Sequence, residues 1–236
     1  MGKRGSSSGF SGQGYDVATS VQSQEGQTVD LKDTPLRYGK PDAALTDAQR
    51  QAVEAFEQKR KSAKVEYAYG VDDKGRAWAP EKRGGKSGVR TPAAYWFPDG
   101  VFTHNHPRTG KEAGLLGGTF SVGTGHRDGD ISTFIANPVR TIRASAAEGT
   151  YSMSKGPGFD GRGLLAFAQQ AEREARKVYK GKCDEAFKRY LANEITGKEY
   201  RAVCDRAFNA LLVSKHNAFI AGQSQFGYTY TLERRS

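Results

Sequence analysis

Two of the four histidines, His104 and His106, stand two residues apart in a segment that ends at Pro107. The β-forming residues over 100–104 predict a strand, and side chains two positions apart on a strand point to the same face. Two neutral imidazoles on one face suit a Zn²⁺ ion. Pro107 cannot donate to a ladder and should end the strand. The pair alone is also compatible with a half-buried strand or an exposed edge.

Acidic residues that could complete a metal site occur on both sides of this pair. A catalytic zinc takes a third protein ligand and keeps a position for water. Asp128 and Asp130 begin a predicted helix over 128–135, after a glycine-rich loop over 107–127 that can fold back. Upstream, Glu66 lies inside an alternating strand pattern, where a carboxylate could take a proton from bound water. Without the histidines, the pattern around Glu66 is that of the solvent face of a one-sided sheet.

Taken together, Glu66, the His-x-His-Pro run, a Phe-Ser at residues 120–121 and an Asp-Ile at residues 130–131 resemble the JAB/MPN (JAMM) metallo-hydrolases. The run is similar in particular to JAB-like domains of phage-encoded proteins. This resemblance covers about residues 60–155.

The resemblance implies a Zn²⁺ ion bound by His104, His106 and Asp130. It further implies that Glu66 is the general base and that Ser121 hydrogen-bonds the tetrahedral oxyanion. The implied reaction is hydrolysis of an amide bond in a protein or peptide substrate, by a peptidase or an isopeptidase.

The spacing of the second block departs from the family. There the aspartate follows the serine by three positions, whereas here eight residues separate Ser121 from Asp130. Asp128 competes for the ligand role, and Asp130 is preferred because Ile131 behind it gives the helix its first buried residue. His126 lies in the inserted segment, where it fits a loop histidine or a contact to metal or substrate.

The remaining pattern predicts an α+β (α/β) fold, in which helices flank a mixed, JAB/MPN-like sheet. Thr46 and Gln49 form a capping box that should start the first helix. The other expected elements are a β-hairpin of 65–71 with 76–79, a second hairpin of 139–146 with 150–154, long helices over 163–193 and 197–222, and a final edge strand over 226–232.

Composition divides the chain into three parts. Residues 1–43 are rich in Gly, Ser and Gln and are predicted to form a disordered arm. Residues 44–158 should form the JAB/MPN-like core. Residues 159–236 should form a helical hairpin and a terminal strand that pack on that core, and His216 in this part is expected to be structural.

Charge and composition limit the partners. The chain has 36 Lys+Arg against 26 Asp+Glu, a net charge of +10. This balance fits a plain basic surface, or contact with nucleic acid or a capsid. Cys183 and Cys204 form no CxxC motif, which argues against a disulfide framework. No apolar run reaches the length of a membrane span and no secretory signal is visible, so a cytoplasmic location is expected, in the host cell or packaged in a virion.

Two other classes of function stay open from the sequence. One is a non-catalytic phage structural or nucleic-acid-binding protein with a relic JAB fold, which need not hold zinc. The other, less favoured, is an HNH-type nuclease. Those nucleases distribute their named residues over a ββα unit, whereas here Pro107 and a loop follow the histidines.

Overall fold

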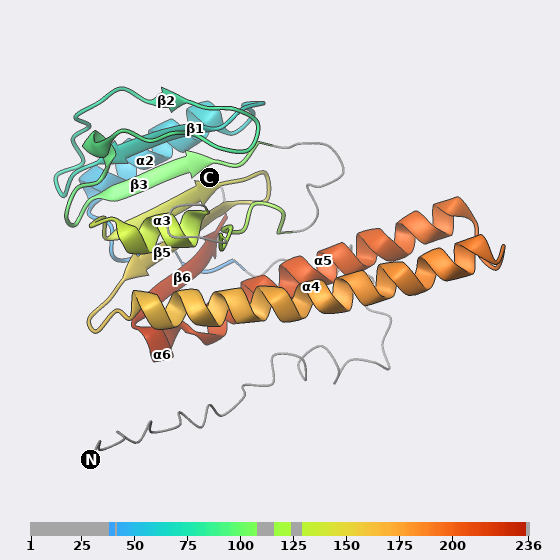
Figure 1. The fold of residues 1–236 in the computed structure, drawn as a ribbon. Helices are drawn as coiled ribbons and strands as arrows, with labels where there is room; N and C mark the ends of the chain where they lie inside the picture. The colour runs from blue at the N-terminus through green and yellow to red at the C-terminus, as the bar shows by residue number, and fades with distance from the viewer. Residues whose placement is uncertain (1–37, 41, 108–115, 124–128, 235–236) are drawn as a thin grey trace, which may run out of the picture.

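A mixed β-sheet forms the centre of the molecule (Figure 1). The computed structural model describes residues 38–40, 42–107, 116–123 and 129–234. Within them the sheet has six strands in the order β2-β1-β3-β4-β5-β6. Only β3 and β4 are parallel among these neighbours, and β6 lies at an edge. The strands are β1 Tyr67–Val71, β2 Lys82–Arg83, β3 Val101–Asn105, β4 Thr141–Ser145, β5 Thr150–Lys155 and β6 Tyr228–Glu233. The predicted α+β class and the terminal edge strand are confirmed.

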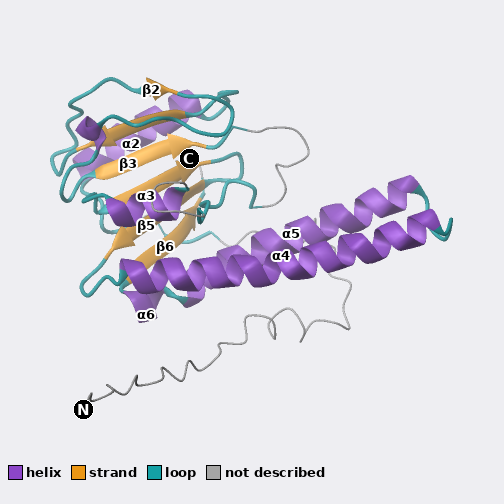
Figure 2. Cartoon of the chain, viewed as in Figure 1, coloured by secondary structure: helices purple, strands orange, loops and turns teal. Residues whose placement is uncertain are grey.

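Helices cover both faces of the sheet (Figure 2). One face carries α2, and the other carries α3 and the base of the long pair α4 and α5. Thr46 caps α2 as predicted, because its side chain accepts from the backbone N–H of Gln49 and the Gln49 side chain accepts from that of Thr46. The helices are α2 Asp47–Arg60, α3 Asp130–Ala136, α4 Gly161–Leu191, α5 Gly197–Ala221 and α6 Gln223–Phe226, with a 3₁₀ turn η1 at Ala93–Tyr95. None of the described helices combines the length and apolarity needed to cross a bilayer.

Alternation along β3 separates two hydrophobic cores. Val101 packs with Val53 of α2 in the smaller core. Phe102 points to the opposite face and joins the larger core with Phe134 of α3 and Leu211 of α5. His104 follows Phe102 by two residues and therefore lies on the face of α3, α4 and α5.

The α2 face also holds a buried ion network. The Arg143 guanidinium is 1% exposed and contacts Glu57 of α2 at 2.8 Å and Glu233 of β6 at 3.0 Å. Burial opposes the charge of Arg143, but the two carboxylates raise its pKa further above the ordinary value. Three segments far apart in the sequence are thereby joined at one point.

The two predicted long helices form an antiparallel hairpin that extends well beyond the sheet (Figure 1). On α4, Leu164, Ala168 and Ala171 are buried near the body, and farther along only Ala186 is. The pair of helices is confirmed, whereas its status as part of a separate unit over 159–236 stays a prediction.

The predicted pairing of 65–71 with 76–79 is wrong. The turn after β1 forms, but β1 pairs instead with β2. The Asp72 carboxylate accepts hydrogen bonds from the Arg76 backbone and guanidinium and from the Trp78 indole. These bonds fold the segment after the turn into a compact loop, so the chain returns to the sheet only at Lys82.

The last residues of the predicted disordered arm pack on the sheet. Gly39 forms a parallel bridge with Glu233, and the buried Asp42 accepts a hydrogen bond of 3.0 Å from Ser152. The expectation of disorder therefore does not hold for this end, because a buried acid with hydrogen-bond partners fixes it. Residues 1–37 and 41 lie outside the described part.

Candidate metal centre

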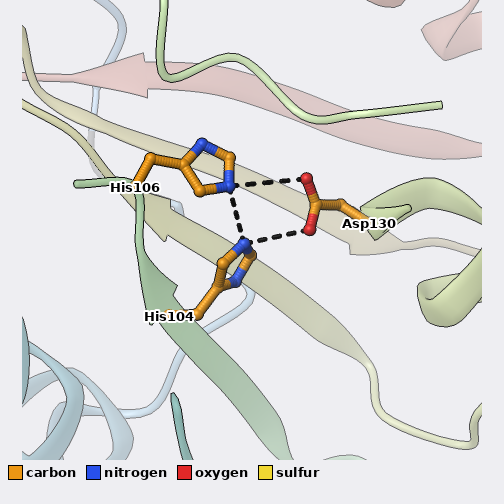
Figure 3. A group of neighbouring side chains, drawn as sticks. All are labelled: His104, His106 and Asp130. Atoms are coloured by element: carbon orange, nitrogen blue, oxygen red, sulfur yellow. Dashed lines mark hydrogen bonds and ion pairs between the residues drawn. The ribbon is translucent and has the colours of Figure 1, made fainter. Parts of the chain in front are cut away.

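His104 and His106 converge as their spacing predicts (Figure 3). Their Nε2 atoms are 2.9 Å apart, and both rings face the same side of the sheet. His104 ends the described ladder of β3 with β1, opposite Ala68. The His106 backbone N–H still bonds to Ser145 of β4, which keeps the chain extended past the strand end.

Asp130 completes the group from the first turn of α3. Its carboxylate oxygens lie 3.0 Å from His104 Nε2 and 3.5 Å from His106 Nε2. Ligand atoms placed about 2.0–2.1 Å from a tetrahedral zinc are about 3.3 Å from one another. The separations found here therefore match those of three ligands of one ion, and the three residues could hold a metal.

A backbone carbonyl fixes the orientation of His106. The His106 Nδ1 lies 2.9 Å from the Gly118 carbonyl oxygen, so Nδ1 carries the proton and Nε2 keeps its lone pair for a metal. Glycine is required at 118, because a Cβ there would lie 1.9 Å from the Ala146 Cβ. His104 Nδ1 is buried without a hydrogen-bond partner among the described residues.

Ser121 holds the third ligand. Its backbone N–H and its hydroxyl both donate to the same Asp130 oxygen at 2.8 Å, and its hydroxyl accepts from the Asp130 backbone N–H at 2.9 Å. The Ser121 carbonyl also accepts from the Ile131 backbone. These bonds anchor the start of α3 even though eight residues separate Ser121 from Asp130. The oxyanion role of Ser121 stays a prediction.

Electrostatics favour a negatively charged Asp130. Burial alone would raise the pKa of its carboxyl, but the two histidines hold that pKa well below the ordinary value. Burial likewise disfavours the charged form of His106, yet Asp130, Glu66 and the Gly118 carbonyl raise its pKa above the ordinary value. The site therefore attracts positive charge to a buried point, as a cation site must.

Glu66 lies beside this group but outside the ligand set. It directly precedes β1 rather than lying mid-strand as predicted, and its backbone pairs with Gly84 and Gly85. Burial raises the pKa of its carboxyl, opposed by the charges of His104 and His106. A carboxyl with a raised pKa next to a metal site is suited to accept a proton.

Asn105, between the two histidines, fixes the segment that carries Glu66. Its side-chain oxygen accepts from the Tyr67 backbone N–H at 2.7 Å, and its side-chain nitrogen donates to the Val65 carbonyl at 3.1 Å. The Asn105 amide thus replaces a backbone strand partner on either side of Glu66. Asn105 was not among the predicted site residues, although a polar residue on the strand face opposite the two histidines was a signal.

The predicted site residues line a single cavity of about 1060 Å³. Its lining includes all five of the side chains assigned to the site, Glu66, His104, His106, Ser121 and Asp130. Further walls come from the loop after β2 and from the base of α4 and α5. The five side chains therefore face one common space.

The described residues place one of the remaining candidates, His216, away from the site. Asp128 and His126 lie outside the described residues. His216 is buried elsewhere, with its Nδ1 2.8 Å from the Tyr230 hydroxyl, and burial lowers its pKa to about 4. This geometry fits the structural role expected for His216.

Comparisons of the chain with models of known protein families, with curated proteins and with solved structures found no match.

Proposed function

We propose that this protein is a zinc-dependent hydrolase of the JAB/MPN type that cleaves an amide bond in a protein or peptide. One observation carries the proposal: His104, His106 and Asp130 converge within ligand distance of one another. Glu66 lines the same cavity. Two imidazoles and one carboxylate with room for water form a common catalytic zinc set, which supports zinc as the metal.

The chain's own groups divide the work of hydrolysis. A zinc ion held here would acidify a water molecule and polarise the scissile carbonyl. Glu66 accepts the proton of the attacking water and delivers it to the leaving amine. Ser121 orients Asp130 through two hydrogen bonds at 2.8 Å, which keeps the ligand oxygen in place. The Gly118 carbonyl does the same for His106.

Metal content and turnover test this proposal separately. Purified wild-type protein should carry one zinc per chain, measured by inductively coupled plasma mass spectrometry, and should cleave members of a peptide mixture followed by liquid chromatography–mass spectrometry. His106→Ala and Asp130→Asn should lose the zinc. Glu66→Gln should keep zinc and lose turnover.

Glu54→Gln is the matched control, because Glu54 is exposed on α2. Hydrolysis retained by Glu66→Gln would contradict the base role. Wild-type protein without zinc would instead favour a relic domain that binds partners. Contact with nucleic acid or a capsid through the basic surface stays a prediction.

A further inference from the structure

Lys215 of α5 is a buried cation in the wall of the metal-site cavity. The residue is 9% exposed and lines the cavity together with Asp130. Within the described residues it forms neither a hydrogen bond nor an ion pair. Most of the Lys215 side chain is buried, and an ammonium with reduced hydration is costly unless an opposite charge compensates it. Burial accordingly lowers the pKa of Lys215.

The carboxylates nearest to Lys215 in the cavity are already engaged. Glu172 of α4 pairs with Arg176 at 2.6 Å. Asp130 is held by the two histidines and Ser121. None of the described carboxylates therefore pairs with the Lys215 ammonium, which leaves it available to a bound group.

The rim of the cavity also carries positive charge. Lys86 and Arg90 lie on the loop after β2, line the cavity and are exposed. Neither forms an ion pair with another described residue. Glu148, the other acid of the lining, accepts from the Gly118 N–H and the Tyr151 hydroxyl. In the described lining, Lys215, Lys86 and Arg90 are thus cations without an ion-pair partner, whereas the Glu148 carboxylate is held by neutral donors.

We infer that Lys215 binds a carboxylate of the substrate, so that the cavity selects acidic peptides. The inference rests on the proposed function and names its substrate class. The carboxylate is an Asp or Glu side chain near the scissile bond or the carboxyl end of the peptide. Apolar side chains of Trp96, Phe208 and Leu211 form the adjoining wall and suit the aliphatic part of such a residue.

Affinity selection tests the inference without turnover. Zinc-loaded Glu66→Gln protein is mixed with a hexapeptide library containing Asp, Glu, Asn and Gln in equal amounts, once with amidated and once with free carboxyl ends. Bound peptides are identified by mass spectrometry. Acidic members of the amidated library should be enriched about tenfold over their amide counterparts if a side chain is read, because charge-assisted hydrogen bonds are the stronger ones. Enrichment of free-acid over amidated peptides would identify the carboxyl end instead.

Lys215→Met in the same background should abolish whichever preference is found, while Lys177→Met, at an exposed position of α4, should leave it intact. The methionine variant should also unfold at a higher temperature, since it removes a buried unpaired charge. Equal recovery of acidic and amide peptides, no recovery of peptide, or an unchanged preference in Lys215→Met would overturn the inference. Because the protein selected here already lacks its base, an inactive wild-type enzyme would refute the proposed function and not this result.

Discussion

Replacement of Asn105 by leucine is expected to release the segment that carries Glu66 while leaving the two histidines on their strand. Asn105 is 2% exposed and makes two hydrogen bonds, of 2.7 Å and 3.1 Å, to the backbone on either side of Glu66. Leucine has the same branching at Cγ, is somewhat larger and has no polar atoms. The Tyr67 N–H and the Val65 carbonyl would therefore lose their partners.

The size of the effect follows from those two bonds. Each unpaired, partly buried backbone group costs about 1–3 kcal/mol, so the loss of both partners should lower the free energy of unfolding by about 2–6 kcal/mol. Zinc content should not change, because the Asn105 amide bonds to Tyr67 and Val65 and not to a metal ligand. Turnover per bound zinc should fall about 100-fold, because a base displaced by about 1 Å loses its geometry for proton transfer.

Urea unfolding, zinc analysis and peptide cleavage measure these three quantities on one preparation. Asn217→Leu is the matched control, since Asn217 is exposed on α5 and the same substitution there should change none of them. If Asn105→Leu cleaved peptide as fast per zinc as the wild type, the amide would not position Glu66. If instead its zinc content fell, the amide would be supporting the histidines.

Three further predictions concern the ligand shell and the buried charges. Ser121→Ala removes the hydroxyl bond to Asp130 and should weaken zinc binding about 10–100-fold in a competition with a chelating dye; an unchanged affinity would contradict the positioning role. His216 has a pKa of about 4 when folded, below its ordinary 6.5, so the unfolded chain takes up the proton first as pH falls from about 6.5 to 4 and stability is lost over that window. Urea unfolding with chelator present measures the free energy of unfolding at pH 7.5 and at pH 4.5. The decrease between these two pH values should be about 2.5 kcal/mol smaller for His216→Gln than for the wild type. Equal decreases would show that His216 is not buried in its neutral form. Arg143→Met leaves Glu57 buried without its partner and should lower the free energy of unfolding by about 3–5 kcal/mol; a change below about 1 kcal/mol would mean that water reaches the network.

Local rules were enough to predict much of the fold. The capping box at Thr46 begins α2, and apolar periodicity marked α4 and α5, because both signals depend on neighbours in the sequence. The prediction of the partner of β1 was wrong because it, too, used only the local pattern. Whether residues 76–79 return to the sheet depends on how the Asp72 carboxylate binds the loop, and alternation alone does not show that.

Part of the candidate site could also be read from spacing. Period 2 on a strand placed His104 and His106 together, and the identity of the next residue favoured Asp130. Asn105, Gly118 and Lys215 were missed, because their parts depend on contacts across the sheet or from α5. A buried lysine on a helix looks like any surface lysine until the elements that cover it are in place.

The length of α4 and α5 has a consequence for how the molecule can be altered. With 31 residues, α4 is about 46 Å long. The residues of α4 and α5 that line the cavity all lie at the end of the hairpin next to the sheet, and none of them lies within 180–207. The rings of Tyr179 and Phe208 lie 6.0 Å apart where the outer turns begin, so a short linker could join the chain there. Shortening the helices at that point would leave the cavity walls intact. A protein bound to the outer turns of α4 and α5 would likewise not contact the residues that line the cavity.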